Sequence, residues 1–219
     1  CSFEPYSQVK DLLPIGMDYY QADVTDTVAV NQAIYAFYGQ YKSLDIVVAN
    51  AGISMTKASI PDFDVGRKVI QVNVLGVLNT FESAIQIMTQ QKSGQLVALG
   101  SIAGTNGLLG TVIYGASKSA VINLCEALEI DLAPYGIHVT TLAPGFIATP
   151  LTQHNTHKMP FMLTQEKAAA IIQQAIVQKK GLYIFPWRMK VVSRILYHLP
   201  RKIYKAFMKW DLLHLRGSH

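Results

Sequence analysis

The sequence predicts a single α/β domain with a doubly wound parallel sheet. Short apolar runs rich in β-branched residues alternate with helical patterns along the chain. Runs such as LDIVVAN and GQLVALG are apolar throughout, which is typical of strands buried on both faces of a parallel sheet. Polar or glycine-rich segments follow the runs that end near residues 22, 49, 99 and 142, at the edge where such sheets bind ligands.

We expect strands at five places and helices at four. The expected strands cover residues 17–22, 44–49, 95–99, 137–142 and 182–185. The expected helices cover residues 27–41, 62–91, 112–135 and 164–179. The last helix has a recognisable start, because the capping hydroxyl of Thr164 precedes an acidic first turn. Strand and helix in alternation place helices on the faces of one sheet.

Composition excludes several classes of protein. The chain has 219 residues and a mass of 24.2 kDa, enough for one domain with a buried core. Half of the residues are hydrophobic and 15% are charged, which excludes disorder for most of the chain. We expect no transmembrane helix, because no run of eighteen apolar residues occurs. The two cysteines, Cys1 and Cys125, cannot form a disulfide framework or a four-ligand zinc site by themselves, which favours a reducing, cytoplasmic location.

Charge is distributed unevenly along the chain. Residues 1–166 carry 8 Lys and Arg against 13 Asp and Glu, whereas residues 167–219 carry 11 against 1. No acidic residue lies between Lys167 and Trp210. The carboxyl-terminal part therefore faces either a negatively charged partner or the acidic remainder of the chain.

Residues 187–216 form a basic amphipathic extension to a domain that covers residues 1–186. Within residues 187–210, basic side chains recur beside an apolar stripe, Pro200 interrupts the helical pattern, and Trp187 and Trp210 bracket the segment. One interpretation is an interfacial helix on an anionic membrane, which would make the protein peripheral. The other is a helix that caps the substrate pocket or contacts another subunit. No nucleic acid is expected, because no recognition motif accompanies the charge. Residues 217–219 resemble the start of a histidine tag.

A tyrosine and a lysine carry the strongest chemical signal. Tyr114 and Lys118 are spaced i, i+4 at the start of a helix, so both side chains lie on one face. A nearby ammonium lowers the pKa of a phenol and makes it a usable acid or base. Ser101 lies thirteen residues earlier at a strand end, where its hydroxyl can bind a substrate oxygen. An isolated pair of this kind is usually only a solvated helix pair.

Over residues 21–150 the sequence resembles the classical short-chain dehydrogenase/reductase family. The resemblance rests on six features in the family's order and spacing: Asp23 in ADVTD, Asn50-Ala51-Gly52, Asn73 in VNVLG, Ser101, the Tyr114-to-Lys118 motif YGASK, and Pro144-Gly145. It implies a Rossmann-type fold, NADP or NAD as cofactor with a preference for NADP, and interconversion of a secondary alcohol and a ketone. It also implies a homo-dimer or tetramer that pairs the helices at 62–91 and 112–135. The extension favours a lipophilic substrate.

The resemblance also implies roles for individual residues. Tyr114 would be the general acid or base, Lys118 would lower its pKa and bind the nicotinamide ribose, and Ser101 would polarise the carbonyl. Asn73 would hold a water of the proton relay, although a polar residue in an apolar helix can also simply mark a kink. The other residues implied to bind the cofactor are Asp23, Val24, Asn50, Ala51, Gly52, Pro144, Gly145, Ile147 and Thr149, together with Tyr114 and Lys118.

Two other classes of function remain open at this point. The chain could be a non-catalytic relative that binds a nucleotide or a partner, but Asn73, Ser101, Tyr114 and Lys118 would then serve no purpose together. It could also be an epimerase or dehydratase acting on a sugar nucleotide. The short region after Pro150 argues against that reading.

The sequence departs from the family at its amino-terminal end. The family's first glycine-rich fingerprint is absent before Asp23, where only an isolated Gly16 occurs. The family's first strand would pair with the strand at 44–49, so we expect a split sheet, a strand at 17–22 without a partner, and a longer folded polypeptide.

Three smaller expectations follow from single segments. His154 and His157 are not expected to bind a metal, because no carboxylate or cysteine lies near them in the sequence. Residues 159–163 are expected to cover the substrate as a lid. Cys125 lies in an apolar helical run, so it is expected to be buried and inert.

Overall fold

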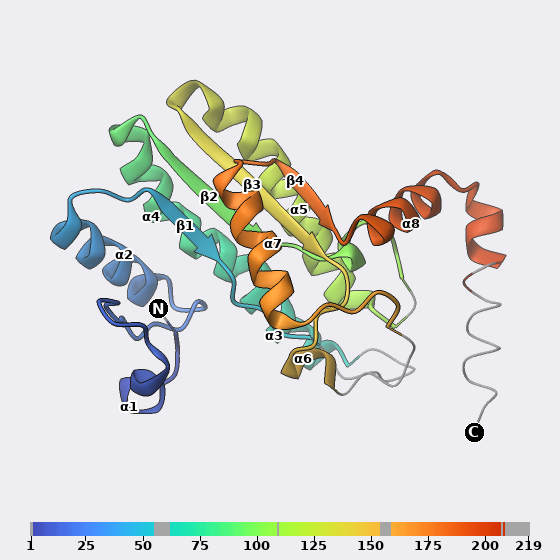
Figure 1. The fold of residues 1–219 in the computed structure, drawn as a ribbon, viewed down its shortest axis with the longest axis horizontal. Helices are drawn as coiled ribbons and strands as arrows, with labels where there is room; N and C mark the ends of the chain where they lie inside the picture. Colours follow the sequence, from blue (N-terminus) through green and yellow to red (C-terminus); the bar gives the residue numbers. More distant parts are fainter. Residues whose placement is uncertain (1, 55–61, 109, 154–158, 207, 209–219) are drawn as a thin grey trace.

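The protein is described by a computed structural model that covers residues 2–54, 62–108, 110–153, 159–206 and 208. Four parallel strands form one sheet in the order β1 (Ile46–Ala49), β2 (Gly94–Leu99), β3 (Ile137–Pro144) and β4 (Leu182–Phe185) (Figure 1). In the register, Ala49 lies opposite Ala98, and Pro144 lies opposite Phe185. The carboxyl ends of all four strands therefore meet at one edge, as a parallel α/β fold requires.

Helices cover both faces of the sheet. The longer ones are α2 (Thr27–Tyr41), α3 (Phe63–Ile70), α4 (Gly76–Gln91), α5 (Val112–Leu132), α7 (Gln165–Val177) and α8 (Trp187–His198). Short helical segments are α1 (Tyr6–Val9), α6 (Pro150–Gln153) and the 3-10 turns Lys10–Leu12, Ile102–Gly104 and Ala133–Tyr135. In Figure 1, α4 and α5 lie behind the sheet and α7 lies in front of it. The doubly wound arrangement is thereby confirmed.

Two apolar cores hold these layers together. The larger lies between β1, β2, β3 and the helices α4 and α5, and it includes Phe81, Met88, Leu96 and Val121. The smaller lies on the opposite face, where Leu142 and Phe185 pack with side chains of α7. Cys125 is buried in the larger core, as expected, and burial raises the pKa of its thiol to about 11.

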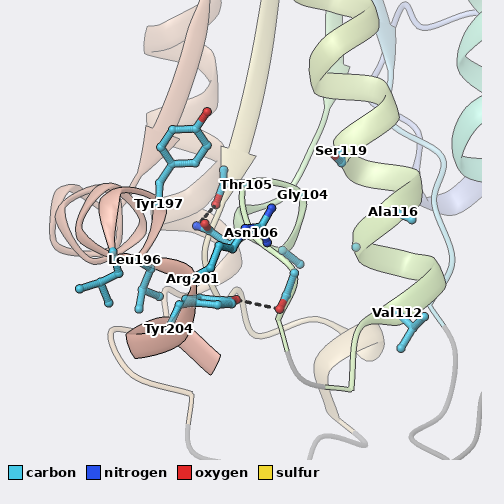
Figure 2. A pocket seen from close by; sticks show the side chains of 14 residues that line it. Gly104, Thr105, Asn106, Val112, Ala116, Ser119, Leu196, Tyr197, Arg201 and Tyr204 are labelled. Carbon is cyan, nitrogen blue, oxygen red and sulfur yellow. Dashed lines mark hydrogen bonds between the residues drawn. The ribbon is translucent and has the colours of Figure 1, made fainter. Parts of the chain in front are cut away.

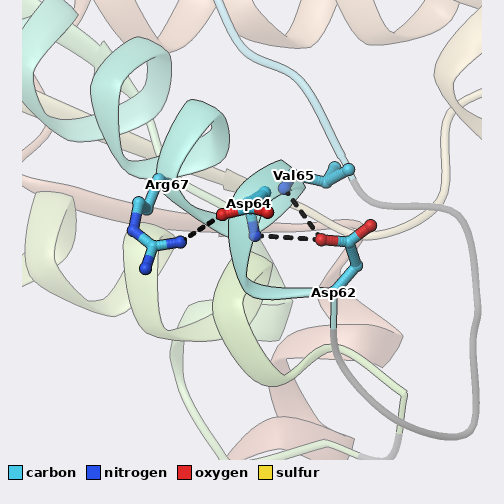
Figure 3. Close-up of polar contacts among 4 residues, drawn as sticks. All are labelled: Asp62, Asp64, Val65 and Arg67. Atoms are coloured by element: carbon cyan, nitrogen blue, oxygen red, sulfur yellow. Dashed lines mark hydrogen bonds and ion pairs between the residues drawn. The ribbon is translucent and has the colours of Figure 1, made fainter.

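The helix that begins after Asp62 is continuous but not uniform. The Asp62 carboxylate accepts hydrogen bonds from the backbone N–H groups of Asp64 and Val65 at 2.9 and 3.2 Å, and Arg67 pairs with Asp64 (Figure 3). Between α3 and α4, residues Gln71–Leu75 form one π-helical turn. Such turns often occur at functional sites because they re-aim a side chain. Here the side chain is that of Asn73.

The expected strand at 17–22 is wrong. Residues 17–20 are in no strand, and Gln21 makes only an isolated bridge to Ser2. As expected in the absence of the family's first strand, residues 17–22 pair with none of the four strands, which themselves pair without a gap. Apolar, β-branched residues alone do not make a strand where no neighbouring strand accepts their backbone hydrogen bonds.

The prediction that both apolar runs are buried on both faces holds for one of them. In β2, the four residues Gln95–Ala98 are fully buried, because α7 covers one face and α4 and α5 cover the other. In β1, Val47 and Ala49 are buried but Ile46 and Val48 are 49% and 44% exposed. No helix among the described residues covers the outer face of this edge strand.

Candidate active site

The carboxyl edge of the sheet collects the segments that the sequence singled out. Asn50, Ala51 and Gly52 follow β1 and are exposed, Ser101 follows β2, and Gly145 follows β3. The parallel register makes them neighbours although they are up to 95 positions apart in the sequence. The prediction that polar segments share one edge is confirmed for these three segments, whereas the fourth, residues 23–26, follows no strand.

Asn73 is the structural centre of the site. Its side chain is fully buried, and its Oδ1 accepts a hydrogen bond from the Ile53 N–H at 2.8 Å. Its amide nitrogen donates to the Ile53 carbonyl at 2.9 Å and to the Ser117 Oγ at 3.0 Å. Asn73 therefore ties the loop after β1 to the helix α5. Both amide N–H groups are used by the protein, so its part in a proton relay remains a proposal.

Ser117 is a residue that sequence reasoning missed. It is fully buried, accepts the hydrogen bond from Asn73 and donates one to the Tyr114 carbonyl at 2.7 Å. The signal that could have revealed it is its position beside Lys118 on the inner face of α5, where a serine needs a partner. It links Asn73 to the helical turn that carries Tyr114.

Lys118 is a buried cation. Its side chain is 4% exposed, and its Nζ donates to the Leu99 carbonyl at 2.6 Å. Burial lowers the pKa of this amine to about 8. A Cβ atom added to Gly52 would lie 3.3 Å from the Nζ, so the ammonium lies against the exposed loop after β1. That position suits contact with a ligand bound over the loop.

Tyr114 and Ser101 form a hydroxyl pair. Burial raises the pKa of the Tyr114 phenol, and a hydrogen bond from Ser101 opposes the rise in part. Ser101 is itself buried, and its Oγ accepts a hydrogen bond from the Ala103 N–H at 3.1 Å. Burial is the largest cause of the raised pKa, and the Lys118 Nζ lies 6.0 Å from the centroid of the Tyr114 ring, so the expected lowering of this pKa by Lys118 remains a proposal.

Asp23 and Val24 lie away from this cluster. The Asp23 carboxylate accepts hydrogen bonds from the N–H and the hydroxyl of Thr25, both at 2.8 Å, so it stabilises its own turn. Val24 packs against Gly76 at the end of the π-helical turn, and its carbonyl accepts from Asn79 at 2.8 Å. Their expected contact with adenine remains a proposal.

The segment after β3 is held on two sides. The Gly145 N–H donates to the Phe185 carbonyl at 2.7 Å, and a Cβ at Gly145 would lie 3.1 Å from Met189 of α8. Ile147 bridges to Leu163, and the Ala148 N–H donates to the Leu163 carbonyl at 2.9 Å.

Pro144 and Thr149 lie at the two ends of the segment that follows β3. Pro144 ends β3, and the Thr149 N–H donates to the Thr152 hydroxyl at 3.0 Å. Leu163, the last residue of the expected lid, is paired with Ile147 and Ala148 of the segment after β3.

No group of three or more metal-binding side chains occurs in the described parts of the chain, and His154 and His157 lie outside them.

Comparison with known proteins places this site in a family. The family model for short chain dehydrogenases matches residues 4–160. The chain belongs to the short-chain dehydrogenase family. An uncharacterized oxidoreductase of Myxococcus xanthus is 34% identical over 187 residues, which cover 85% of this chain and 74% of that protein. The resemblance of residues 21–150 is confirmed.

Two further relatives are named for an activity or a ligand. A cyclohexanol dehydrogenase of a Rhodococcus species is 38% identical over 152 residues, and the match covers 64% of this chain but only 56% of the relative. The structure titled "ElxO with NADP Bound" superposes with a TM-score of 0.70 at 28% identity and covers 77% of this chain and 76% of its own. Within the described residues, every helix is too short or too polar to cross a membrane.

Proposed function

We propose that the protein is an NAD(P)-dependent oxidoreductase that interconverts a secondary alcohol and a ketone. The observation that carries the proposal is the hydroxyl pair of Tyr114 and Ser101 at the carboxyl edge, with buried Lys118 beside it. A non-catalytic binding protein has no use for a buried cation next to a half-buried phenol, because both cost free energy to desolvate. The cyclohexanol dehydrogenase among the relatives supports the reaction class.

The described residues suit the nicotinamide end of such a cofactor. Asn50, Ala51 and Gly52 form an exposed loop, and the absence of a side chain at Gly52 leaves the Lys118 Nζ accessible from it. In the family these residues, with Pro144, Gly145, Ile147 and Thr149, would hold the cofactor, which supplies hydride chemistry when bound. We favour NADP over NAD, because the ElxO relative binds it.

The chain's own residues would handle the proton. Because burial raises the pKa of Tyr114, the phenol is protonated at neutral pH and suits the role of acid in ketone reduction. The Ser101 hydroxyl, bonded to the phenol, would orient the substrate oxygen toward it. Lys118 would bind the ribose and place a positive charge near the phenolate that forms when the proton leaves.

Exchange of the phenol tests the proposal. Tyr114→Phe removes the proton donor and little volume, so the rate of cofactor oxidation with a ketone panel should fall by about 10²–10⁴-fold. Tyr135→Phe is the matched control, since Tyr135 is exposed just beyond the other end of α5. Unchanged reductase activity of Tyr114→Phe would falsify the mechanism. Saturable cofactor binding without turnover on any ketone would favour the non-catalytic alternative.

We propose a homo-oligomer paired through α4 and α5. Along α5, Val121, Cys125 and Leu132 are buried in the domain core, while Leu124 and Leu128 are half-buried and line a groove with Leu78 and Ile85. A second copy would cover this groove. Light scattering of the protein at micromolar concentration should give at least a dimer, and Leu124→Glu should give a monomer. A monomeric wild-type protein contradicts the pairing.

We propose, as a second candidate feature, that the substrate is lipophilic and reaches the site from an anionic membrane. Trp187, Val191 and Ile195 expose apolar side chains along one ridge of α8, and Arg188 and Arg194 flank it. Such a ridge with flanking cations is typical of interfacial helices, and each cation contributes about 1 kcal/mol near anionic lipid. Trp210 lies outside the described residues.

Vesicle binding tests this feature. The protein should co-sediment with phosphatidylserine vesicles at low salt, and Val191→Asn with Ile195→Asn should release it. Arg201→Glu, Lys202→Glu and Lys205→Glu together should also weaken attachment. Absence of binding, or binding that survives both sets of changes, would show that the ridge has another role.

A further inference from the structure

A cavity lies between α5 and α8. We call it the α8 cavity; it has a volume of about 610 Å³, which is in the range of small-molecule sites. Its walls are the turn after Ser101, the outer face of α5, the end of α8 and the helical turn that follows Pro200 (Figure 2). Neither Tyr114 nor Ser101 lines it.

The face of α5 that lines this cavity is not the catalytic face. Val112, Ala116 and Ser119 line the cavity and recur at i, i+4 and i+7, which puts them on one side of the helix. Tyr114 and Lys118 lie on another side, toward the Leu99 carbonyl. In Figure 2, the helix α5 that carries Val112, Ala116 and Ser119 lies across the hollow from Leu196, Arg201 and Tyr204. The α8 cavity is therefore distinct from the active site.

Hydrogen bonds hold the cavity open on the α8 side. The hydroxyls of Thr105 and Ser193 are 2.9 Å apart, and the Asn106 amide donates to the Ser193 carbonyl at 3.3 Å. The Tyr204 hydroxyl donates to the Gly107 carbonyl at 2.7 Å. Ser193 is buried, so α8 is anchored to the turn rather than loosely laid on it. The cavity is a built feature of the fold.

The chemistry of the lining favours an amphipathic anion. Arg201 is the cation of the cavity, and among the described residues no acidic side chain lines the cavity or pairs with it. Ser119 also lines the cavity, and its hydroxyl can donate a hydrogen bond. Leu196 and Leu199 add an apolar wall. One guanidinium matches one negative charge, and its planar fork suits a carboxylate.

We propose that the α8 cavity is a second binding site, which takes a small amphipathic carboxylate through Arg201. The carboxylate lies against the Arg201 guanidinium and the Ser119 hydroxyl. The aliphatic part lies along Leu196, Leu199 and Val112. The site is independent of the proposed oxidoreductase activity, because it shares no side chain with the proposed catalytic residues.

Titration calorimetry with sodium octanoate on the full chain tests the site. Octanoate should bind saturably, and octanol and acetate should each bind about tenfold more weakly, because each lacks one half of the recognition. Arg201→Gln should weaken octanoate binding by about tenfold or more, the usual effect of a lost charge-assisted hydrogen bond. Ala116→Leu should weaken it, because the larger side chain takes up part of the cavity.

Two matched variants locate the site. Arg194→Gln removes another exposed α8 cation that does not line the cavity, and it should leave octanoate binding unchanged. Ser101→Ala should also leave it unchanged, although that change impairs the proposed activity. The proposal is overturned by the absence of saturable binding, by equal binding of octanol, or by octanoate binding that is undiminished in Ala116→Leu. Loss of binding in Ser101→Ala would place octanoate in the active site and overturn it as well. Thermal unfolding of each variant confirms that it is folded.

Discussion

The charged and polar groups on the two sides of the helix α5 differ in burial. On the inner side, Lys118 is buried, and Asn73 and Ser117 have all their hydrogen bonds within the protein. On the outer side, Arg201 and Ser119 are exposed and lie on a cavity open to solvent. The inner side is fixed before any ligand arrives, as general acid chemistry requires. The outer side keeps polar groups free to bind.

The comparison also explains where single changes should matter. A buried, bonded group cannot be removed without leaving its partners unsatisfied, whereas water replaces the partners of an exposed group. Four changes test this contrast, and they are ordered from the largest expected effect to the smallest.

Gly104 packs against the backbone of α5 and also lines the α8 cavity, so its replacement should disturb both sides of the helix. A Cβ at Gly104 would lie 2.6 Å from the Lys118 carbonyl carbon, which is backbone and cannot move aside. Gly104→Ala should therefore lower the free energy of unfolding by about 3 kcal/mol or more. Gly107→Ala is the matched control, because nothing lies within 4 Å of its Cβ position. Urea unfolding measures the free energy of unfolding of both variants. Equal values would contradict tight packing between η3 (Ile102–Gly104) and α5.

Lys118 should make stability depend on pH. Its pKa is about 8 in the folded state against an ordinary 10.5, so between these values the unfolded chain holds more protons and the folded state gains stability as pH rises. The full gain is about 3 kcal/mol. Lys118→Met should lack it, so the stability difference between variant and wild type should change by that amount between pH 7 and pH 10.5. Parallel curves for the two proteins would mean that the amine is solvated.

Asn73 should matter through its hydrogen bonds. Asn73→Ala leaves the Ser117 hydroxyl and the Ile53 backbone without this partner, which should cost about 2 kcal/mol of stability. Gln90→Ala on the exposed side of α4 should cost less than about 0.5 kcal/mol. Thermal unfolding measures both. A neutral Asn73→Ala would show that the π-helical turn does not depend on this side chain.

The exposed cations of α8 should contribute almost nothing to folding. Arg194→Gln should change the free energy of unfolding by less than about 0.5 kcal/mol at low and at high salt. A larger loss that disappears at high salt would reveal an ion pair and would remove the contrast between the two sides of α5.

The same contrast limits what the sequence could predict about burial. β1 and β2 have similar apolar sequences, yet only β2 is covered on both faces. Burial of a strand depends on which helices lie over it, and that is decided by the chain at a distance. For the same reason, the apolar residues at 17–22 were mistaken for a strand: their composition suits one, but no neighbouring strand pairs with them.

Within the twelve residues of α8, some side chains are buried and others are exposed. The basic amphipathic pattern predicts either an interfacial helix on an anionic membrane or a helix that caps the substrate pocket or contacts another subunit. In the structure, Met189 and Ser193 face the domain, Leu196 lines the cavity, and Trp187, Val191 and Ile195 are exposed. The pattern alone does not assign residues to the buried and the exposed face, because that depends on where the helix packs.

The sequence by itself determined the parallel sheet, the helix α5 and the family, because periodicity and motif spacing are local properties of the chain. Tyr114, Lys118, Ser101 and Asn73 were found in this way. Only the tertiary structure decided that burial raises the pKa of Tyr114 and lowers that of Lys118, since desolvation depends on every atom packed around a group. It alone also showed the bond between Ser117 and Asn73, because a contact across 44 positions leaves no trace in local pattern.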